Sequence, residues 1–479
     1  MNLSKAAGNS LWILAASGVN KVSSIVLLVV LTRALGAEGF GSFSYALFFV
    51  LFFSSLTELG LTPVLIRYVN ASGGRADSSK AQGVGLAIGL VSTGVAILLA
   101  CVGATLFGLD PDIRLLICIA SASLLISFRD ITFRWILEVP FRASLKMRTP
   151  ALIGIGSELI GLLLVIVAVS HSSSVAVILA LYVVSNLPGF ILLAVLSFKE
   201  IVPTLAPGGV GPVEVLREAA PIAASNFMIT VYLAVGALML FRYSGAESLA
   251  YYALAFRLTT SLRVIPEAIG HSLLPLMATA HAEDGGMERV AALFGRAIKY
   301  VSLAAFPLAL GTMAVAPNVA TLVGGESFSP ASLALAVLIW ATFFAFFNTV
   351  LRFTFNAVAF QRLSFWLYLV VALSTVLLSA LLIPRWGLAG ACAALALSEA
   401  LGLVVGAVMG ARVGLGVRPG VMAGEMVRVA AASVVMAGVV WYLPNLLLQV
   451  IVGIIAYTFF VLLFGGVSRR ELFGWLRLG

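Results

Sequence analysis

The sequence predicts an all-α integral membrane protein of about fourteen transmembrane helices, in which two six-helix bundles are followed by two C-terminal helices. Three observations predict this fold class: the composition, the length of the apolar runs and an internal repeat. Of the 479 residues, 61% are hydrophobic and 10% are charged, and the mean hydropathy is +1.12. Ordinary globular proteins are about half apolar and about a quarter charged. A soluble fold could not cover this much apolar surface, so the composition excludes one.

Apolar runs of span length follow one another along the whole chain. About 20 apolar residues cross a membrane as one helix, and these runs are continuous rather than alternating, which excludes a transmembrane β-barrel. Turn and charge signals divide them into fourteen predicted spans, near residues 10–32, 41–66, 82–108, 115–137, 150–170, 175–197, 219–241, 249–276, 298–323, 331–352, 363–383, 387–410, 425–443 and 446–465. The first run continues through Asn20 and Lys21, so we predict a helix there and not a signal peptide.

The basic residues predict the orientation in the membrane. With a cytoplasmic N-terminus, 22 of the 29 basic residues fall in cytoplasmic loops and helix ends. The other seven are Lys21, Arg257 and Arg263 inside spans, and Arg33, Arg114, Arg242 and Arg385 in outer loops. Cytoplasmic loops of membrane proteins are enriched in basic residues, so we predict a multi-pass protein of the cell (cytoplasmic) membrane with both termini in the cytoplasm. The same rule explains the net charge of +9, and no nucleic-acid partner is predicted.

An internal repeat predicts two halves. Residues 33–38 after the first span and 242–247 after the seventh share the pattern Arg-x-x-Gly-Ala-Glu, and the same offset of 209 residues aligns Glu58 with Glu267. Six spans separate the copies, so the halves should have the same orientation and be related by an axis along the membrane normal. The predicted domains are an N-terminal bundle at 1–200, a Pro- and Gly-rich cytoplasmic linker at 201–216, a C-terminal bundle at 217–412, and helices 13 and 14 with a cytoplasmic tail at 413–479.

Several segments resemble a known family. Residues 31–41 (LTRALGAEGFG) and the Phe-rich span that ends at Glu58-Leu-Gly-Leu61 resemble the opening of polysaccharide biosynthesis proteins, the lipid-linked oligosaccharide flippases. Residues 382–399 (LIPRWGLAGACAALALSE) resemble the turn between spans 11 and 12 of that family, and 324–328 and 355–362 are also similar. The resemblance implies the MATE-like fold of the multidrug/oligosaccharidyl-lipid/polysaccharide exporter superfamily. In this fold two six-helix bundles form a V around a central cavity and work by alternating access.

Motifs of enzymes are missing from the sequence. It contains no P-loop, no G-x-S-x-G elbow and no H-E-x-x-H, which indicates a transporter rather than an enzyme. Neither the cysteines nor the histidines are spaced as metal ligands, so we predict no metal and no cofactor beyond a coupling H⁺ or Na⁺. Gly402, Gly406 and Gly410 are spaced to let another helix approach closely, and we interpret them as packing residues.

Three cations inside spans are the predicted cargo-binding residues. A charge at a helix centre costs about 2.5–3.5 kcal/mol on insertion scales, so it should face a partner or water and not lipid. Lys21 shares a polar face of span 1 with Ser17, Asn20 and Ser24. In span 8, Arg263 lies within about 80° of Thr260, Glu267 and His271, with Arg257 about 40° beyond, at 100° per residue. Because arginine and lysine suit phosphate oxygens, Lys21, Arg257 and Arg263 predict an anionic cargo.

Five other residues are predicted to act in coupling or gating: Glu58, Glu267, His271, Asp130 and Arg134. Asp130 and Arg134 lie four residues apart near the cytoplasmic end of span 4, where they could pair with each other or line a gate. Glu58, Glu267, Glu158 and Glu399 could instead serve only in structural ion pairs between helices. His271 could titrate near neutral pH or be a hydrogen-bonded structural residue.

Together these residues predict a flippase. It would move a polyprenyl-diphosphate-linked oligosaccharide from the cytoplasmic to the outer leaflet by alternating access, for the synthesis of a cell-surface polysaccharide or glycan. The expected partners are the lipid-linked oligosaccharide, the bilayer, and a glycan polymerase or glycosyltransferases. A cation-coupled multidrug antiporter is one alternative, but it needs mid-span carboxylates, and none of the aspartates is at mid-span. A membrane glycan polymerase or ligase is another, but the predicted outer loops are too short for its active site.

Overall fold

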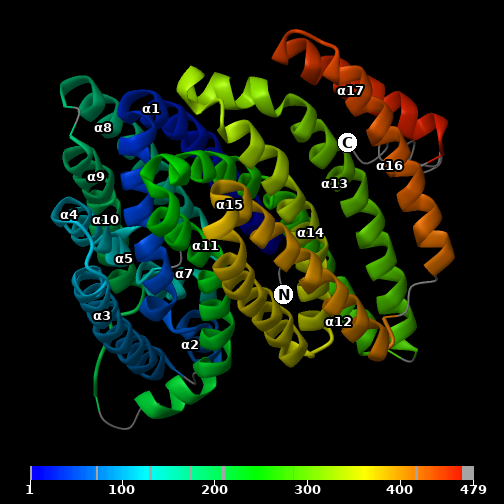
Figure 1. The fold of residues 1–479 in the computed structure, drawn as a ribbon. Coiled ribbons are helices and arrows are strands. Elements are labelled where there is room, and N and C mark those ends of the chain that lie inside the picture. The colour runs from blue at the N-terminus through cyan, green and yellow to red at the C-terminus, as the bar shows by residue number, and fades with distance from the viewer. Residues whose placement is uncertain are drawn as a thin grey trace. The chain divides into compact units, whose positions relative to one another are not determined.

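The computed structural model describes residues 3–71, 74–128, 132–172, 174–206, 211–283, 285–415 and 419–465, and for residues 3–11, 13–15, 17, 75 and 419–422 it describes the backbone alone. These residues form α-helices and one short 3₁₀ helix, and they contain no β-strand (Figure 1). An all-helical chain is expected of an apolar sequence in lipid, because a helix satisfies its own backbone N–H and C=O groups. The predicted all-α fold class is therefore confirmed.

The helices of the first half differ in length, from 56 residues in α1 to four in α5 and α6. They are α1 (Leu3–Glu58), α2 (Leu61–Ala71), α3 (Arg75–Leu106), α4 (Pro111–Ser121), α5 (Ser123–Ile126), α6 (Arg134–Leu137), α7 (Val139–Ala143), α8 (Arg148–His171), α9 (Val175–Val184) and α10 (Leu187–Glu200). The second half contains α11 (Pro212–Ser261), α12 (Val264–His281), α13 (Gly286–Gly324), the 3₁₀ helix η1 (Glu326–Phe328), α14 (Ala331–Ala357), α15 (Gln361–Arg412), α16 (Pro419–Trp441) and α17 (Leu446–Leu463).

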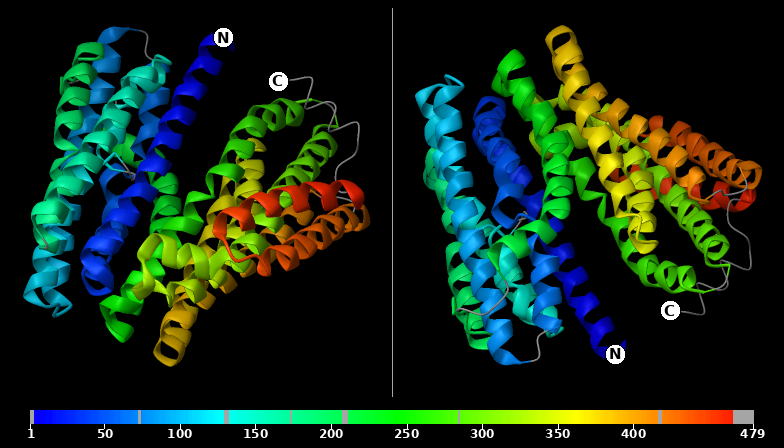
Figure 2. Two further views of the ribbon diagram at one scale, coloured as in Figure 1. Left: turned by 90° about the horizontal axis from the view of Figure 1, so that it is seen from above. Right: turned by 90° about the horizontal axis from the view of Figure 1, so that it is seen from below.

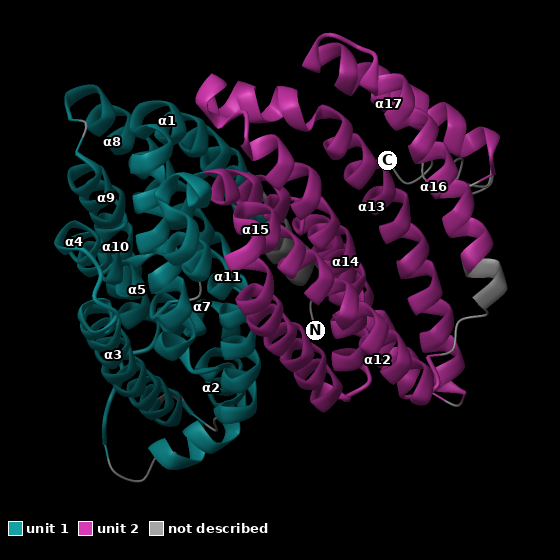
Figure 3. Ribbon diagram, viewed as in Figure 1, with its two compact units in different colours: residues 1–250 teal, residues 251–479 magenta. Residues whose placement is uncertain are grey.

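The chain forms two compact units, residues 1–250 (unit 1) and 251–479 (unit 2), which are coloured separately in Figure 3. The boundary between them falls inside α11 and not in the Pro- and Gly-rich connection at 201–216. The division into two six-helix bundles, which the repeat predicts, concerns transmembrane topology and stays a prediction.

Both copies of the repeated motif are sites where a long helix bends. Helix α1 is interrupted at Gly36 (φ 64°, ψ −173°) and α11 at Gly245 (φ 79°, ψ −177°). Only glycine adopts this region of φ/ψ space readily, because a Cβ atom would clash there. The two bends lie near each other in unit 1: a Cβ atom added at Gly41 would lie 1.9 Å from the carbonyl oxygen of Ala246. The shared motif therefore has a shared backbone conformation.

Ten helices within the described residues are long and apolar enough to cross a membrane. Three of the helical stretches, α1, α11 and α15, are each two helices joined at a glycine, and the third of these joints is Gly387. Gly36 and Gly245 lie in predicted outer turns and Gly387 begins the predicted twelfth span. The number of fourteen spans stays a prediction.

The predicted continuous span at 115–137 is wrong. Helices α4, α5 and α6 replace it, and the chain is extended at Ser127 (φ −65°, ψ 141°). The carbonyl oxygen of Ser127, which the break removes from the helix, accepts hydrogen bonds from Thr132 Oγ1 (3.0 Å) and Arg134 Nε (3.2 Å). A broken helix is tolerated inside a membrane protein when other groups satisfy its backbone in this way.

The eighth predicted span is also broken. Helix α11 ends at Ser261 and α12 begins at Val264, with Arg263 in the turn between them. Pro266 explains the break, because its ring nitrogen has no N–H to donate to the carbonyl of Leu262, and it is accommodated in the first turn of α12. The single helical face predicted for Thr260, Arg263, Glu267 and His271 is therefore divided between two helices.

The glycines of α15 pack as predicted. A Cβ atom at Gly402 would lie 2.4 Å from Val371 Cγ2 and 3.2 Å from Asn348 Nδ2, and one at Gly406 would lie 2.9 Å from Leu351 Cδ1. Gly402 thus lets the C-terminal part of α15 approach α14 closely. The approach brings the neighbouring turn of α15, which carries Glu399, against Asn348.

Helices α16 and α17 pack along α13 in unit 2, as both views of Figure 2 and Figure 1 show. Polar contacts join α17 to α13: Tyr457 Oη donates to the carbonyl oxygen of Leu303 (2.7 Å), and Asn318 Nδ2 donates to Gln449 Oε1 (2.9 Å). These two helices are the ones that stand outside the predicted repeat.

Candidate functional site

A buried ion pair lies at the centre of unit 2. Arg263 Nη2, in the turn before α12, is 3.1 Å from Glu399 Oε1 on α15. Asn348 on α14 donates from Nδ2 both to Glu399 Oε2 (2.8 Å) and to the Glu399 carbonyl oxygen (2.9 Å). The Glu399 side chain is 1% exposed and that of Arg263 16%. A carboxylate this deeply buried is held in its charged form only by such partners.

Two further polar side chains lie beside this pair. Tyr368 on α15 is buried and has Arg352, Glu399 and Arg263 as charged neighbours. Arg352 lies one turn after Asn348 on α14, so the two side chains share a helix face. We call Arg263, Asn348, Arg352, Tyr368 and Glu399 the unit 2 polar cluster. It carries two cations and one anion, so it has a net positive charge.

The other predicted residues of span 8 flank this cluster. Arg257 is half-buried on α11. Glu267 is exposed in the first turn of α12. The His271 ring packs edge-on against Phe353 of α14, with centroids 4.8 Å apart, and has Arg352 and Glu267 as charged neighbours. Of the three predicted cargo cations, Arg257 and Arg263 thus belong to unit 2.

Lys21 belongs to unit 1. Its side chain is exposed, and Asn20 and Ser24 on the same helix are half-buried. Ser17, the fourth residue of the predicted polar face, lies outside the described side chains. Binding of one cargo by Lys21 together with the two arginines stays a prediction.

Glu58 caps a helix in unit 1. It is the last residue of α1 and 2% exposed. Its Oε2 accepts from the backbone N–H of Gly60 (3.0 Å) and its Oε1 from that of Thr62 at the start of α2. A carboxylate at this place satisfies helix donors and complements the positive end of the helix dipole. The local position of Glu58 therefore differs from that of Glu267, with which the repeat aligns it.

Arg134 belongs to a second buried charge cluster, in unit 1. Its guanidinium pairs with Glu138, which also accepts from Arg142 Nη2 (2.6 Å). Burial lowers the pKa of the Arg142 guanidinium from its ordinary value, and the nearby Glu58 carboxylate opposes this shift. Asp130, the predicted partner of Arg134, lies outside the described residues. Arg134 and Arg142 each form an i, i+4 ion pair with Glu138.

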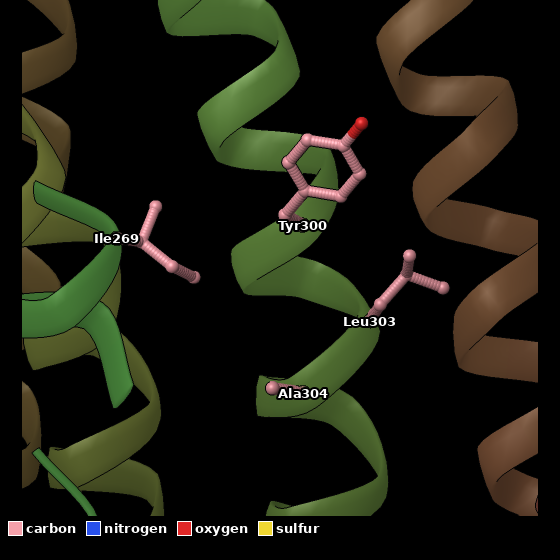
Figure 4. A pocket seen from close by; sticks show the side chains of 4 residues that line it. All are labelled: Ile269, Tyr300, Leu303 and Ala304. Carbon is pink, nitrogen blue, oxygen red and sulfur yellow. The ribbon is translucent and has the colours of Figure 1, made fainter. Parts of the chain in front are cut away.

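Unit 2 also has an open pocket of about 450 Å³ (Figure 4). Ile269 of α12 and Tyr300, Leu303 and Ala304 of α13 line it, and none of the predicted site residues does. Among the described residues, no three histidine, cysteine or acidic side chains are grouped so as to hold a metal ion.

Sequence reasoning missed Asn348, Arg352 and Tyr368. Arg352 ends the predicted tenth span and was assigned to the cytoplasmic helix ends. The spacing of Asn348 and Arg352, four residues apart on a Phe-rich helix, is a signal of a polar face that could have found both. The partnership of Arg263 with Glu399 links residues 136 positions apart, which no local pattern predicts.

Comparison with known protein families shows to which family the chain belongs. The sequence profile of the family described as polysaccharide biosynthesis protein matches residues 6–281, more than half of the chain. The chain belongs to this family. The family predicted from residues 31–41 and 382–399 is therefore confirmed. Comparison with curated protein sequences gives no significant match.

Solved structures with the same fold include flippases and transporters. The lipid II flippase MurJ in its inward closed conformation is similar over 97% of this chain and 99% of its own, with a TM-score of 0.75 and 13% identity. An inward-facing multidrug resistance MATE family transporter of the MOP superfamily is similar over 82% and 94%, with a TM-score of 0.62 and 14% identity. The Vibrio cholerae MATE transporter VcmN in its bent form is similar over 86% and 98%, with a TM-score of 0.57 and 14% identity. These similarities confirm the predicted MATE-like fold of a multi-pass membrane protein.

Proposed function

We propose that this protein is a flippase that moves a polyprenyl-diphosphate-linked oligosaccharide from the cytoplasmic to the outer leaflet by alternating access. The observation that carries the proposal is the net positive polar cluster inside unit 2, with Arg257 on the preceding helix. A cluster of guanidiniums in a membrane protein suits a phosphate-bearing cargo, because arginine donates paired hydrogen bonds to phosphate oxygens. Membership of the polysaccharide biosynthesis family and the fold shared with a lipid II flippase support the same cargo class.

The proposal assigns a part to each predicted cation. The diphosphate contacts Arg257, Arg263 and Lys21, the sugars occupy the polar interior, and the prenyl chain remains in lipid. Glu399 holds Arg263 until a phosphoryl group competes for it. Such an exchange of partners would give the cargo the differential contacts through which a ligand shifts a conformational equilibrium.

The competing function on this fold is a cation-coupled multidrug antiporter. A carboxylate that recruits a cationic drug must be available to it, but Glu399 is already engaged by Arg263 and Asn348. This engagement favours the anionic cargo. A glycan polymerase or ligase would instead have to lengthen or transfer the glycan chemically.

Transport in proteoliposomes distinguishes the three functions. Full-length protein is reconstituted with a fluorescent polyprenyl-diphosphate oligosaccharide, and an impermeant quencher reports how much has moved between leaflets. We expect quenching to rise above that of protein-free liposomes, with the glycan unchanged in mass and no efflux of ethidium. Ethidium efflux under a proton or sodium gradient without movement of the glycolipid would refute the proposal, as would lengthening of the glycan.

A further inference from the structure

Arg352 has no acidic partner among the residues that the structure describes. It lies half-buried on α14, and no carboxylate of the described residues lies within ion-pair distance of its guanidinium. Its Nε is buried and has no hydrogen-bond partner among those residues, while its Cζ lies 4.4 Å from the centroid of the Phe353 ring. Arg263, by contrast, has the Glu399 carboxylate at 3.1 Å. Of the two arginines in the unit 2 polar cluster, Arg352 is therefore the one whose charge no described carboxylate neutralises.

The groups around Arg352 come from three helices and can all donate to an anion. Tyr368 of α15, which has Arg352 as a charged neighbour, is 7% exposed. His271 of α12 has Arg352 as a charged neighbour and packs on Phe353. Glu399, a charged neighbour of Tyr368, is engaged by Arg263 and Asn348. The Arg352 Nε–H, which has no partner among the described residues, thus lies near a tyrosine hydroxyl and an imidazole that can each donate a hydrogen bond to an anion.

A guanidinium that is partly withdrawn from water in a membrane protein is stabilised by a counter-ion. We propose that Arg352 and Tyr368 form an anion-binding subsite for the phosphoryl groups of the cargo, and that Arg352 holds them before Arg263 does. Arg263 must first exchange Glu399 for the cargo, whereas Arg352 has no anion to lose. The inference rests on the proposed function, which supplies a cargo with phosphoryl groups.

The headgroup of an anionic phospholipid presents the same phosphoryl chemistry. A diphosphate carries more charge and more acceptor oxygens than a phosphodiester, so its bonds to a guanidinium and a hydroxyl are stronger. We therefore assign the subsite to the diphosphate, and phosphatidylglycerol is the competitor that tests this assignment.

Binding of a short prenyl diphosphate to the purified full-length protein tests the subsite. The probes are farnesyl diphosphate and farnesol, and the Kd of each is measured in a neutral detergent. Because farnesol lacks only the diphosphate, the difference between the two Kd values reports the contribution of the diphosphate to binding. We expect the wild type to prefer farnesyl diphosphate, and Arg352→Ala to weaken its binding at least about tenfold, as expected for loss of a charge-assisted contact. Binding of farnesol should not change, and Arg352→Lys should restore part of the affinity.

Three further variants separate a direct contact from a general loss of structure. Tyr368→Phe removes one hydroxyl and should weaken farnesyl diphosphate binding by a smaller factor than Arg352→Ala. Glu399→Gln should strengthen it, because Arg263 then loses its competing anion. The matched control is Arg289→Ala in the same unit, because Arg289 is exposed and paired with Glu283, and its removal should leave both affinities unchanged.

The outcomes distinguish this inference from the proposed function. If the wild type prefers farnesyl diphosphate and a folded Arg352→Ala variant binds it equally well, the subsite is wrong and the proposed function stands. If phosphatidylglycerol displaces farnesyl diphosphate at equal concentration, the occupant is a membrane lipid and the assignment to cargo is overturned. If the wild type binds farnesol and farnesyl diphosphate alike, both the proposed function and the subsite fail.

Discussion

Arg263 and Glu399 form an ion pair at 3.1 Å across 136 residues of chain, with the carboxylate only 1% exposed. Arg263 is predicted to bind cargo, whereas the sequence suggests a structural ion pair between helices as the role of Glu399. The ion pair is compatible with both roles. When no cargo is bound, Glu399 is the counter-ion that a buried cation such as Arg263 needs. The pair also explains why Asn348 is directed at the same carboxylate.

Removing Glu399 should destabilise the protein. Glu399→Ala leaves Arg263 uncompensated in the interior, a change that typically costs about 3–5 kcal/mol. Thermal unfolding of the purified protein should show a clearly lower Tm. The double variant Arg263→Met, Glu399→Met should recover most of the loss, because it removes both charges together. Glu283→Ala breaks an exposed pair and should change the Tm little, and an equal Tm for Glu399→Ala and the wild type would disprove the structural role of the pair.

The bends at Gly36 and Gly245 should each require glycine. Alanine at either position would occupy a region of φ/ψ space that costs about 1–3 kcal/mol for other residues. Gly94 on α3 is the control, because a Cβ atom there meets no neighbour and helical Gly→Ala changes stabilise by about 0.5–1 kcal/mol. We expect Gly36→Ala and Gly245→Ala to lower the Tm and Gly94→Ala to maintain or raise it. Equal Tm values for all three variants would contradict the bends.

Glu58 should act through stability and not through coupling. Glu58→Ala deprives the first turn of α2 of its acceptor, and lost caps cost about 0.5–2 kcal/mol. Glu58→Gln retains one carbonyl acceptor and should be milder. Both variants should flip glycolipid at wild-type rates per folded molecule in proteoliposomes. A normal Tm with abolished transport would instead assign Glu58 to the coupling role that its place in the membrane predicts.

The orientation in the membrane can be tested by labelling single cysteines. Cys101, Cys118 and Cys392 are first replaced, since all three are free thiols. With both termini in the cytoplasm, a cysteine at position 445 should react with an impermeant maleimide applied to intact cells, and one at position 75 should react only after permeabilisation. Labelling of position 75 in intact cells would reverse the predicted orientation.

Much of the fold could be predicted from the sequence, because lipid requires continuous apolar helices and glycine marks the bends between them. The motif around Gly36 and Gly245 correctly predicted two related turns. The break at Ser127 could not be predicted, because its freed carbonyl is satisfied by Arg134, seven residues away and beyond any helical spacing. An apolar run alone does not show whether such a partner is present.

The site was predicted less completely than the fold. Helical periodicity could identify Arg263 as a buried cation. It assumed one continuous helix, however, whereas the helix is interrupted before Pro266. The counter-ion of Arg263 comes from a different helix, so its identity depends on tertiary packing. Arg352 was not predicted as a site residue because it lies at the end of a predicted span, where a basic side chain ordinarily reaches the headgroups.

The proposed function requires that Lys21, Arg257 and Arg263 bind a diphosphate-linked glycan as it crosses the membrane. The most direct measurement is the rate of glycolipid flipping in proteoliposomes by Lys21→Ala, Arg257→Ala and Arg263→Ala, with each rate normalised to folded protein and compared with Arg289→Ala. The account predicts that Arg257→Ala and Arg263→Ala abolish flipping, that lysine at these positions rescues it only in part, and that Lys21→Arg is tolerated better than Lys21→Ala. If all three alanine variants fold and flip the glycolipid at the rate of Arg289→Ala, these cations do not bind cargo and the account is wrong.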